Sequence, residues 1–480
     1  MQPLEGMDAA FLSLETPTTP LHVGVVMVLD PPEGTRSLFS PSTRFTQIRR
    51  IIEGRLHLVG PMRQRAIRVP LGLHHPVWVD DPDFELDDHL SRASLPTPGG
   101  QKELDVFVAA AMSRQLDPDR PLWEMYFVEG LEDGRAALIA KMHHAILDGV
   151  SGASILAAFL DLTPRARVVP LPGGPWDPGP LPNNTQMLRY AANALPQQPG
   201  RAMGTLRAGV EAIADLGTHN RTLQSQGEVP PPAFFSAPRT SFNGAVSNRK
   251  RFSTLSLPLE DAKLVRRVFS CTVNDVLLAG VAGGLRRLLA ARGESAAQPL
   301  VAMVPVSTRP EGEGEALGNQ VSGMLVSLAT DIDDPVRRLD AIAESTRVSK
   351  DQEQLHRGRL VGDLAQIAAP ALVSRLARAV AGTKLFDHMR PPFNVTVSGV
   401  KGPEFPLFCA GSRVSALYPL GPIAEGIGLN VTIFSYLDHL YFGLFACRKL
   451  LPELEELAIN IDDALGELVG CALDARGETG

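Results

Sequence analysis

Two adjacent histidines and a nearby aspartate are the residues of this sequence with the clearest chemical potential. His143 and His144 follow an apolar run, 136–142, and three residues separate them from Asp148-Gly149. The run predicts a strand, and a loop that leaves a strand end is where a rigid scaffold presents reactive side chains. Because imidazole titrates near neutral pH, a positioned histidine can remove a hydroxyl proton as a general base. The spacing therefore indicates a candidate proton-transfer site.

The acidic residue of this pattern needs its own partner. Asp148 stands among apolar residues, so its charge requires a basic side chain or several hydrogen-bond donors, and Gly149 permits a turn that a side chain would obstruct. Two other interpretations stay open here. The histidines could be satisfied core residues at a strand end, or His143, His144 and Asp148 could bind a metal, although no further carboxylate stands nearby to support such ligands.

The chain around these residues predicts alternating strands and helices. In the first part, runs rich in apolar and β-branched residues predict strands at 21–30, 122–131 and 136–142. Asp133-Gly134, between the last two, is a hairpin signal. Apolar residues at helical spacing predict helices at 45–58, 104–116 and 150–160.

A long connection follows the first part. Seven prolines fall within 164–182, a density that excludes helix and sheet, and three more stand at 230–232. Between them, 187–223 is compatible with helix. We therefore expect an N-terminal subdomain at 1–165, a connection at 166–245 and a C-terminal subdomain at 246–480.

The second part also mixes strands and helices. Strands are predicted at 251–257, 300–306, 321–329, 394–400, 429–435 and 440–446, and helices at 335–354, 360–380 and 453–468. A further helix begins at Thr272, which has the capping-box partner Asp275 three residues later. The fold class is therefore α/β with mixed sheets, in two subdomains of similar size with a cleft between them.

Composition excludes several classes of function. The 480 residues are 44% hydrophobic and 21% charged, which is ordinary for a globular protein. A net charge of −7 does not suit a protein that wraps nucleic acid. The four cysteines are far apart, which favours a reducing compartment over disulfides or zinc, and we see no signal peptide or membrane-spanning run. We expect a cytoplasmic protein whose membrane contact is peripheral.

The pattern HHxxxDG is the signature of the CoA-dependent acyltransferase superfamily, and the sequence resembles the bacterial wax ester synthase/diacylglycerol acyltransferase family. Residues 3–11 are similar to the opening of that family, and 20–23 follow as in the family. Further blocks occur in the family order at 76–84, 89, 121–124, 274–275, 305–309, 318–319 and 428–436. The resemblance covers nearly the whole chain, and the ordered set is more specific than any one block.

The resemblance implies two chloramphenicol-acetyltransferase-like subdomains with the active site in a tunnel between them. It implies transfer of a fatty acyl group from acyl-CoA, which is a substrate, to diacylglycerol or a long-chain alcohol, with no cofactor. His144 would be the general base beside His143, and the acceptor hydroxyl would attack the thioester directly, without a covalent acyl-enzyme. Asp148 would be structural, paired with an arginine, for which Arg309 is the candidate.

Four further residues are candidates for the site. The resemblance places the Asn274-Asp275 pair near the histidines, where Asn274 would orient the base or donate to the oxyanion and Asp275 would contact substrate. The alternative for Asn274 is a bond to a backbone amide at the helix start. Pro121 and Trp123 would form a turn and wall of the substrate site. The pair His74-His75 lacks a following Asp-Gly and is expected on an exposed turn.

The chain also departs from the family pattern. It reads Ser-Gly-Val-Lys-Gly-Pro over 398–403, where the family often has Ser-Asn-Val-Pro-Gly-Pro, and Cys447 begins a basic stretch where acidic residues are usual. Apolar stripes at 188–223 and 360–380 would dock on a membrane or a lipid inclusion, unless they pack in the core. Two alternatives remain: an acyltransferase for another alcohol, such as a glycolipid or polyketide, and a non-catalytic lipid-binding relative.

Overall fold

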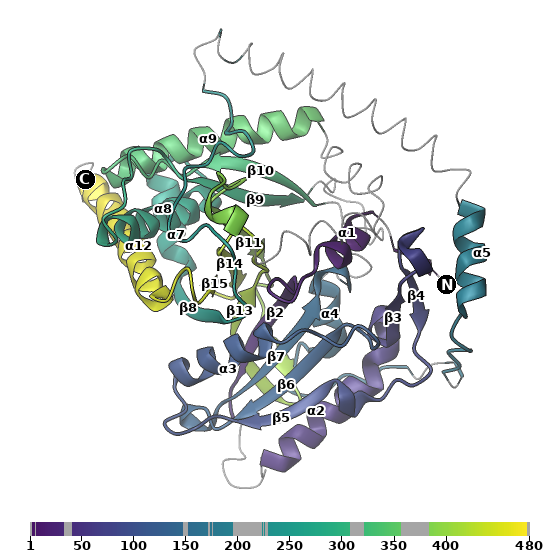
Figure 1. Cartoon of the computed structure of the whole chain (residues 1–480). Helices are drawn as coiled ribbons and strands as arrows, with labels where there is room; N and C mark the ends of the chain where they lie inside the picture. Colours follow the sequence, from purple (N-terminus) through teal and green to yellow (C-terminus); the bar gives the residue numbers. More distant parts are fainter. Residues whose placement is uncertain are drawn as a thin grey trace.

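The computed structural model describes most of the chain, from Gln2 to Gly477. The described residues are 2–4, 6–32, 41–146, 152–170, 173–174, 176–194, 223, 225, 229–307, 321–356 and 384–477. They form a mixed α/β fold built on two six-stranded sheets, which Figure 1 shows one above the other. The predicted fold class is therefore confirmed.

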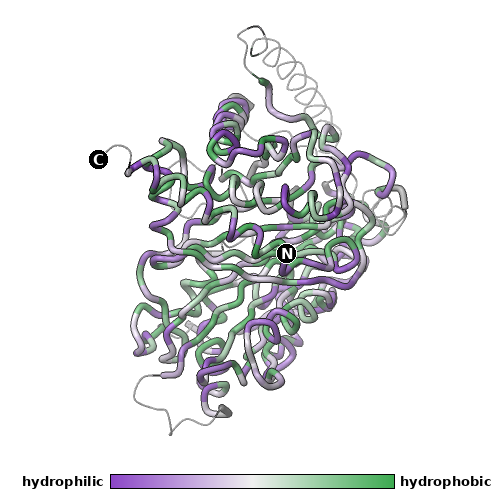
Figure 2. Tube along the Cα trace, turned by 90° about the vertical axis from the view of Figure 1, so that its left-hand side faces the viewer, coloured by the Kyte–Doolittle hydropathy of each residue, from purple (hydrophilic) through white to green (hydrophobic). Residues whose placement is uncertain are grey.

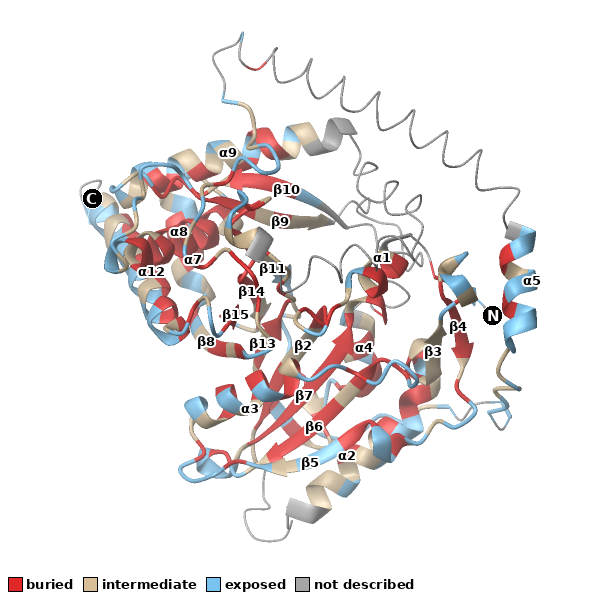
Figure 3. Ribbon diagram, viewed as in Figure 1, coloured by how far each residue is buried: buried red, intermediate tan, exposed pale blue. Residues whose placement is uncertain are grey.

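The first sheet carries the histidine pair. Its strands lie in the order β12 (Phe408–Cys409), β13 (Ser412–Leu420), β2 (His22–Leu29), β7 (Ala136–His143), β6 (Trp123–Glu129) and β5 (Leu90–Ser94). All pairs are antiparallel except β5 with β6. Every residue of β7 is buried, which fits its apolar sequence and its central place (Figure 3).

Helices cover both faces of this sheet. On one face, α2 (Pro41–Arg55) and α4 (Gly152–Phe159) pack Ile48, Ile52 and Ile155 against Leu29 and Leu138. On the other face, α3 (Gln101–Ser113) forms a second cluster that includes Leu104, Val108, Val26 and Ile139. Even-numbered residues of β2 and odd-numbered residues of β7 therefore face α3, because side chains alternate along a strand.

The second sheet belongs to the later part of the chain. Its order is β10 (Val321–Ser327), β9 (Val301–Ser307), β11 (Val395–Lys401), β14 (Leu429–Tyr436), β15 (His439–Cys447) and β8 (Lys250–Pro258). Strand β11 runs parallel to both of its neighbours, and the other pairs are antiparallel.

Within the described ranges, four helices pack with this sheet: α7 (Leu259–Phe269), α8 (Val273–Ala291), α9 (Pro335–His356) and α12 (Leu454–Gly477). Helices α8 and α12 approach closely through glycines. A Cβ atom on Gly284 would lie 2.9 Å from the backbone nitrogen of Ile461, and one on Gly280 would lie 2.4 Å from Leu465. Glycine is therefore required at both positions for this packing.

The two halves of the chain share a sheet. Strand β13 comes from the later part of the chain but pairs with β2 in the first sheet. In addition, Phe252 of β8 and Phe445 of β15 belong to the same buried cluster as α3. The predicted subdomain limits at 165 and 245 stay predictions. The chain returns to the first sheet at β13, after it has already formed strands of the second sheet.

A small third sheet lies beside the N-terminus. Its order is β1 (Gln2–Pro3), β4 (Val77–Asp80) and β3 (Gln64–Ile67), and α5 (Asn184–Ala194) packs Met187 and Ala191 against Val69 and Val77. Helix α1 (Gly6–Leu14) follows β1. Short 3₁₀ turns complete the described elements: Leu56–Leu58, Gly60–Arg63, Pro70–Gly72, Leu86–Asp88, Glu132–Gly134, His144–Ile146 and Lys384–Asp387.

Hydropathy follows this layering. In Figure 2 apolar segments run through the sheets, while polar segments lie mainly at the outside. No single helix within the described ranges has the length and apolar character to cross a membrane; the bent pair of α7 and α8, at 103°, meets those two criteria only when taken together.

Candidate active site

His143 ends the central strand of the first sheet and points toward α3. Its backbone N–H donates to the carbonyl of Leu122 at 2.9 Å, and the N–H of Ala145 donates to its Nδ1 at 3.1 Å. The residue is 1% exposed, and its Nε2 has no hydrogen-bond partner. Burial lowers the pKa of His143 to about 3, and the charges of His144 and Arg68 add to this. Its ring is therefore neutral, with the proton on Nε2, because Nδ1 accepts a bond.

His144 turns away from the strand onto α1. It opens the 3₁₀ turn His144–Ile146, and its ring stacks on Phe11 with 4.0 Å between centroids. Its Nδ1 is buried and has no partner outside the residue, although the residue itself is only half-buried. Burial lowers the pKa of His144 to about 4, and a contact with its own backbone partly opposes this. The imidazole is neutral at physiological pH, so a ring nitrogen keeps a lone pair for a proton.

The backbone of His144 is held by a strained residue. Its N–H donates to the carbonyl of Leu21 at 3.1 Å, and Leu21 has a φ of +50°, in the left-handed region. That conformation costs a residue with a side chain about 1–3 kcal/mol, and such residues cluster at functional sites. The chain thus bends immediately before β2 in a way that aims a carbonyl at the histidine turn.

A polar network lies behind the histidines on the α3 side of the sheet. Lys141 has no exposed surface, and its Nζ donates to Glu124 at 3.1 Å and to the carbonyl of Arg114 at 2.7 Å. Tyr126 also donates to Glu124. Burial lowers the pKa of Lys141, and Glu124 opposes this shift. The network satisfies a buried cation two residues before His143, which favours a rigid strand end.

Asn274 and Asp275 lie in the first turn of α8, a helix that packs with the second sheet. Thr272 accepts from the N–H of Asp275 at 3.2 Å, and Asp275 Oδ2 accepts from the N–H and the hydroxyl of Thr272 at 2.9 and 2.6 Å. The predicted capping box is therefore confirmed, and it is Asp275 rather than Asn274 that closes it. A substrate contact for Asp275 stays a prediction, with its Oδ1 buried and unpartnered.

Asn274 is half-buried and faces the exposed end of β11. Its Oδ1 lies 3.1 Å from the place where a Cβ on Gly399 would stand. Gly399 is the residue that occupies the position of the usual asparagine in the family pattern. This departure from the family pattern thus lies directly against a predicted site residue, where a side chain would crowd the amide of Asn274.

Sequence comparisons cover most of the chain. Residues 4–277 match the wax ester synthase/diacylglycerol acyltransferase catalytic domain, and residues 317–469 match the WS/DGAT C-terminal domain. The chain belongs to the wax ester synthase/diacylglycerol acyltransferase family. As a member it is an acyltransferase that transfers an acyl group to an alcohol.

Individual relatives agree with this family. A protein of Mycobacterium tuberculosis that is assigned by name as a diacylglycerol O-acyltransferase is 38% identical over 475 residues, and the match covers 98% of each chain. A second protein from that organism with the same assigned name is 34% identical over 480 residues, which cover 99% of this chain and 91% of the relative.

Solved structures support the same fold. The wax ester synthase/diacylglycerol acyltransferase of Marinobacter aquaeolei VT8 is 30% identical, with a TM-score of 0.68, over 98% of this chain and all of that one. The first condensation domain of the calcium-dependent antibiotic synthetase has a TM-score of 0.54 at 14% identity, over 98% of this chain and 96% of that one, which shows a shared fold only.

Trp123 is the first residue of β6 in this acyltransferase, and Pro121 lies two residues before it. Pro121 is buried, and its carbonyl accepts from the N–H of Trp123 at 2.8 Å. The indole of Trp123 is 1% exposed, donates to the carbonyl of Met62 at 2.8 Å and stacks on His89 with 4.6 Å between centroids. These contacts make Trp123 part of the subdomain core, and its role in substrate binding stays a prediction.

Several predicted residues lie outside the described residues. These are Asp148, Gly149 and Arg309, together with the predicted docking helix at 360–380 and most of the one at 188–223. Their roles in this acyltransferase stay predictions. The pair His74-His75 is half-buried, and the ring of His74 lies 5.1 Å from that of Tyr190. The prediction that this pair lies on an exposed turn was therefore wrong.

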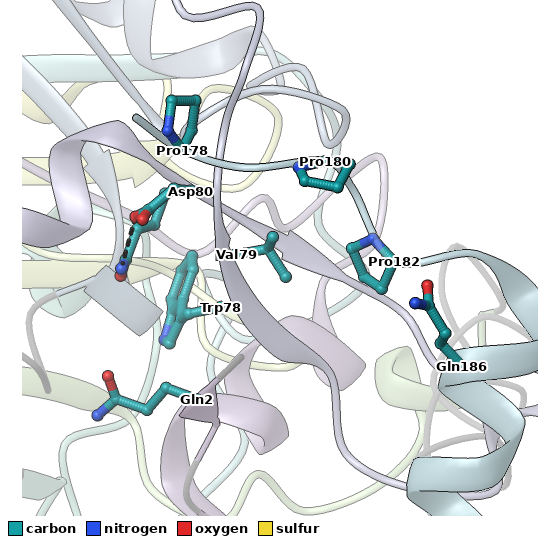
Figure 4. A pocket seen from close by; sticks show the side chains of 9 residues that line it. Gln2, Trp78, Val79, Asp80, Pro178, Pro180, Pro182 and Gln186 are labelled. Carbon is teal, nitrogen blue, oxygen red and sulfur yellow. Dashed lines mark hydrogen bonds between the residues drawn. The ribbon is translucent and has the colours of Figure 1, made fainter. Parts of the chain in front are cut away.

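Two cavities lie near the N-terminal part of the acyltransferase. One cavity, of about 370 Å³, opens between β4 and the proline-rich connection. Its lining includes Trp78, Pro180 and Asp80 (Figure 4). The carboxylate of Asp80 accepts a hydrogen bond from Gln64 at 3.0 Å. The other, of about 180 Å³, lies at the end of α1 and is lined by Glu15 and Arg68. Neither is lined by the histidine pair. Among the described residues no cluster could hold a metal ion.

Three residues that shape this site were not predicted from the sequence. Phe11, Leu21 and His22 all lie in blocks that resemble the family, but no role followed from their types alone. Their positions against the histidine turn depend on the pairing of β2 with β7, in which His22 lies directly opposite His143. A histidine in a strand otherwise made of apolar residues is the one signal that could have drawn attention to this place.

Proposed function

We propose that this protein transfers a long-chain fatty acyl group from acyl-CoA to diacylglycerol, with long-chain alcohols as a second class of acceptor. The observation that carries the proposal is the neutral, half-buried His144 at the end of β7, in a chain of this family. The assigned names of the Mycobacterium tuberculosis relatives favour diacylglycerol as the acceptor.

His144 acts as the general base in the proposed mechanism. With its Nδ1 buried, Nε2 is the nitrogen that meets the acceptor hydroxyl. It takes the hydroxyl proton as the oxygen attacks the thioester carbonyl, which forms a tetrahedral intermediate. The intermediate then collapses, the carbon–sulfur bond breaks, and the imidazolium returns the proton to the CoA thiolate. The protein forms no covalent bond to the acyl group, so no cofactor is needed.

Asn274 stabilises the tetrahedral intermediate in the same proposal. Its side-chain amide, at the start of α8 and beside the glycine of β11, donates a hydrogen bond to the developing oxyanion. The loss of one such donor typically costs about 3–4 kcal/mol of transition-state stabilisation. Asp148 and Arg309 form an ion pair that holds the loop after His144 in shape, and Trp123 and Pro121 support the wall of the substrate site.

The substrates place the reaction at a lipid surface. Diacylglycerol and long acyl chains partition into membranes and lipid inclusions, so we propose a cytoplasmic enzyme that associates peripherally with such a surface.

The test is an acyl-transfer assay with purified wild type and His144→Ala. Labelled long-chain acyl-CoA is offered with diacylglycerol or with a long-chain alcohol, and the products are separated by chromatography. Triacylglycerol from wild type, and none from a folded His144→Ala variant, supports both the acceptor and the base. Binding of acyl-CoA by wild type without transfer to either alcohol refutes the proposed acceptors, and glycolipid or polyketide alcohols are then the next substrates to offer.

A further inference from the structure

His22 and His143 form a pair of buried imidazoles across the central strands. They occupy opposite positions in the register of β2 and β7, so their side chains leave the same face of the sheet. Their ring centroids are 6.3 Å apart at an interplanar angle of 80°. His22 is 2% exposed and His143 is 1% exposed, so both rings are inside the protein.

Hydrogen bonds at the outer ends of the pair fix which nitrogen of each ring carries a proton. The N–H of Ala145 donates to Nδ1 of His143, which leaves the proton of that neutral ring on Nε2. Nδ1 of His22 lies 3.4 Å from the carbonyl oxygen of Met112, which accepts but cannot donate. The neutral His22 ring therefore carries its proton on Nδ1 and presents a bare Nε2.

The two remaining nitrogens are complementary and unsatisfied. Nε2 of His143 is a donor and Nε2 of His22 is an acceptor, and both are buried without a hydrogen-bond partner among the described residues. An unsatisfied buried polar group costs about 1–3 kcal/mol, so leaving both unpaired is unfavourable. Neither atom touches space open to water, and the ring centroids are 6.3 Å apart, so the other ring is a candidate partner for each nitrogen.

Both rings are held neutral by their surroundings, as such a pair requires. Burial is the first cause that lowers the pKa of each ring. The cations Lys141 on β7 and Lys250 on β8 lower the pKa of His22 further, and Arg68 does the same for His143. Within the described part of the chain, the bond of His22 to the carbonyl of Met112 opposes this shift, and no carboxylate adds to that opposition on either ring.

We propose that His143 Nε2–H donates to His22 Nε2 in the working enzyme, and that His22 is thereby a positioning residue for His144. This rests on the proposed role of His144 as the base. The bond closes a chain from the end of α3, through Met112, His22 and His143, to the N–H of Ala145. Because Ala145 follows His144 directly, this series of hydrogen bonds fixes the turn that orients the imidazole of His144. Bonds of this kind are often long in the free enzyme and shorten when substrate binds.

Two substitutions of His22 separate hydrogen bonding from packing. His22→Phe keeps a ring of similar size but offers no acceptor, whereas His22→Gln places an amide oxygen near the position of Nε2. We expect His22→Phe to lower kcat by about 100-fold, a loss that a misplacement of about 1 Å can cause, while KM for acyl-CoA stays unchanged. We expect His22→Gln to retain most of the wild-type kcat.

The direct readout is nitrogen NMR of the imidazoles in protein labelled with ¹⁵N-histidine. The proposal predicts a neutral His143 with its proton on Nε2, a neutral His22 with its proton on Nδ1, and a Nε2 signal of His143 that shifts in His22→Phe. His89→Phe is the matched control, because His89 is also buried but bonds to the carbonyl of Trp123. It should leave the His143 signals in place.

Several results would overturn the proposal. A proton on Nδ1 of His143, or a kcat for His22→Phe equal to that of wild type, removes its basis. Equal losses in His22→Phe and His22→Gln would mean that packing, not the hydrogen bond, is what His22 provides. If wild type fails to acylate any alcohol, the proposed function is wrong, but the tautomers measured in wild type still decide whether the pair exists.

Discussion

Replacing Phe11 with alanine should move the acid limb of the pH profile to higher pH. The ring of Phe11 stacks on the imidazole of His144 at 4.0 Å, and burial is the main reason that the pKa of His144 falls to about 4. Without the ring, water reaches the imidazole and the charged form is penalised less. The pKa of His144 therefore rises, and at a given acidic pH less of the base is free to accept a proton.

The size of the effect follows from the limits of the shift. Complete rehydration would return the pKa of His144 from about 4 to its ordinary value of 6.5. If the variant has a pKa of about 6, only about a tenth of its His144 is neutral at pH 5, whereas most of it is neutral in wild type. The value of kcat/KM at pH 5, relative to its plateau near pH 8, should then be about tenfold lower than in wild type.

The assay is the pH dependence of kcat/KM for wild type, Phe11→Ala and Phe11→Leu. Leucine keeps an apolar cover over His144, so Phe11→Leu should resemble wild type more than Phe11→Ala does. An acid limb of Phe11→Ala at the same pH as that of wild type, or at lower pH, would refute the claim that this contact keeps His144 dehydrated. A uniform loss of kcat/KM at all pH values would instead mean that Phe11 acts by holding substrate or backbone.

Three further predictions concern stability, measured by urea denaturation. Arg55→Met should destabilise the protein by about 3–5 kcal/mol, because it removes the guanidinium bonded at 2.8 Å to the buried carboxylate of Asp161 and leaves only the partly exposed Arg167, at 3.9 Å, as a cation. Gly284→Ala should cost about 1–3 kcal/mol by forcing α8 from α12, whereas Gly470→Ala, where a Cβ meets nothing within 4 Å, should be neutral or stabilising. Stability should fall as pH drops from 6.5 toward 4, because four histidines with a lowered pKa stay neutral in the native state while those of the unfolded chain bind protons. Two acids whose pKa is raised to about 7 act in the opposite direction, but they are fewer. The histidines are His22, His89, His143 and His144, and the acids are Glu15 and Asp105. Equal urea midpoints at pH 6.5 and 5 would contradict the last prediction.

Local patterns predicted most of the elements around the site. The apolar run before His143 predicted β7, and Thr272 with Asp275 predicted the start of α8. Both predictions were possible because a buried strand and a helix cap depend on residues that are close together in the sequence. Helix α7 was not predicted, although it follows Pro258 and its buried residues Ala262 and Val265 are at helical spacing, so a local signal was present.

Long-range pairings could not be predicted in the same way. Strand β13 joins β2 from nearly 400 residues away in the chain, and no local pattern encodes that partner. The contacts of Phe11 and His22 with the histidine pair depend on the same kind of pairing. Strand parity left open which histidine faces which side, and the structure assigns His143 to the α3 face and His144 to α1 because the chain enters a 3₁₀ turn at His144.

The most direct test of the account is a single experiment on wild type and His144→Gln with labelled acyl-CoA, in the presence and absence of diacylglycerol. CoA release and the intact mass of the protein are followed together. Direct transfer with His144 as the base predicts CoA release from wild type that depends on the acceptor, no gain of an acyl mass by the protein at any time, and loss of release in the folded variant. A protein that carries the acyl group before acceptor is added, or a variant that releases CoA at the wild-type rate, would contradict direct transfer with His144 as the base.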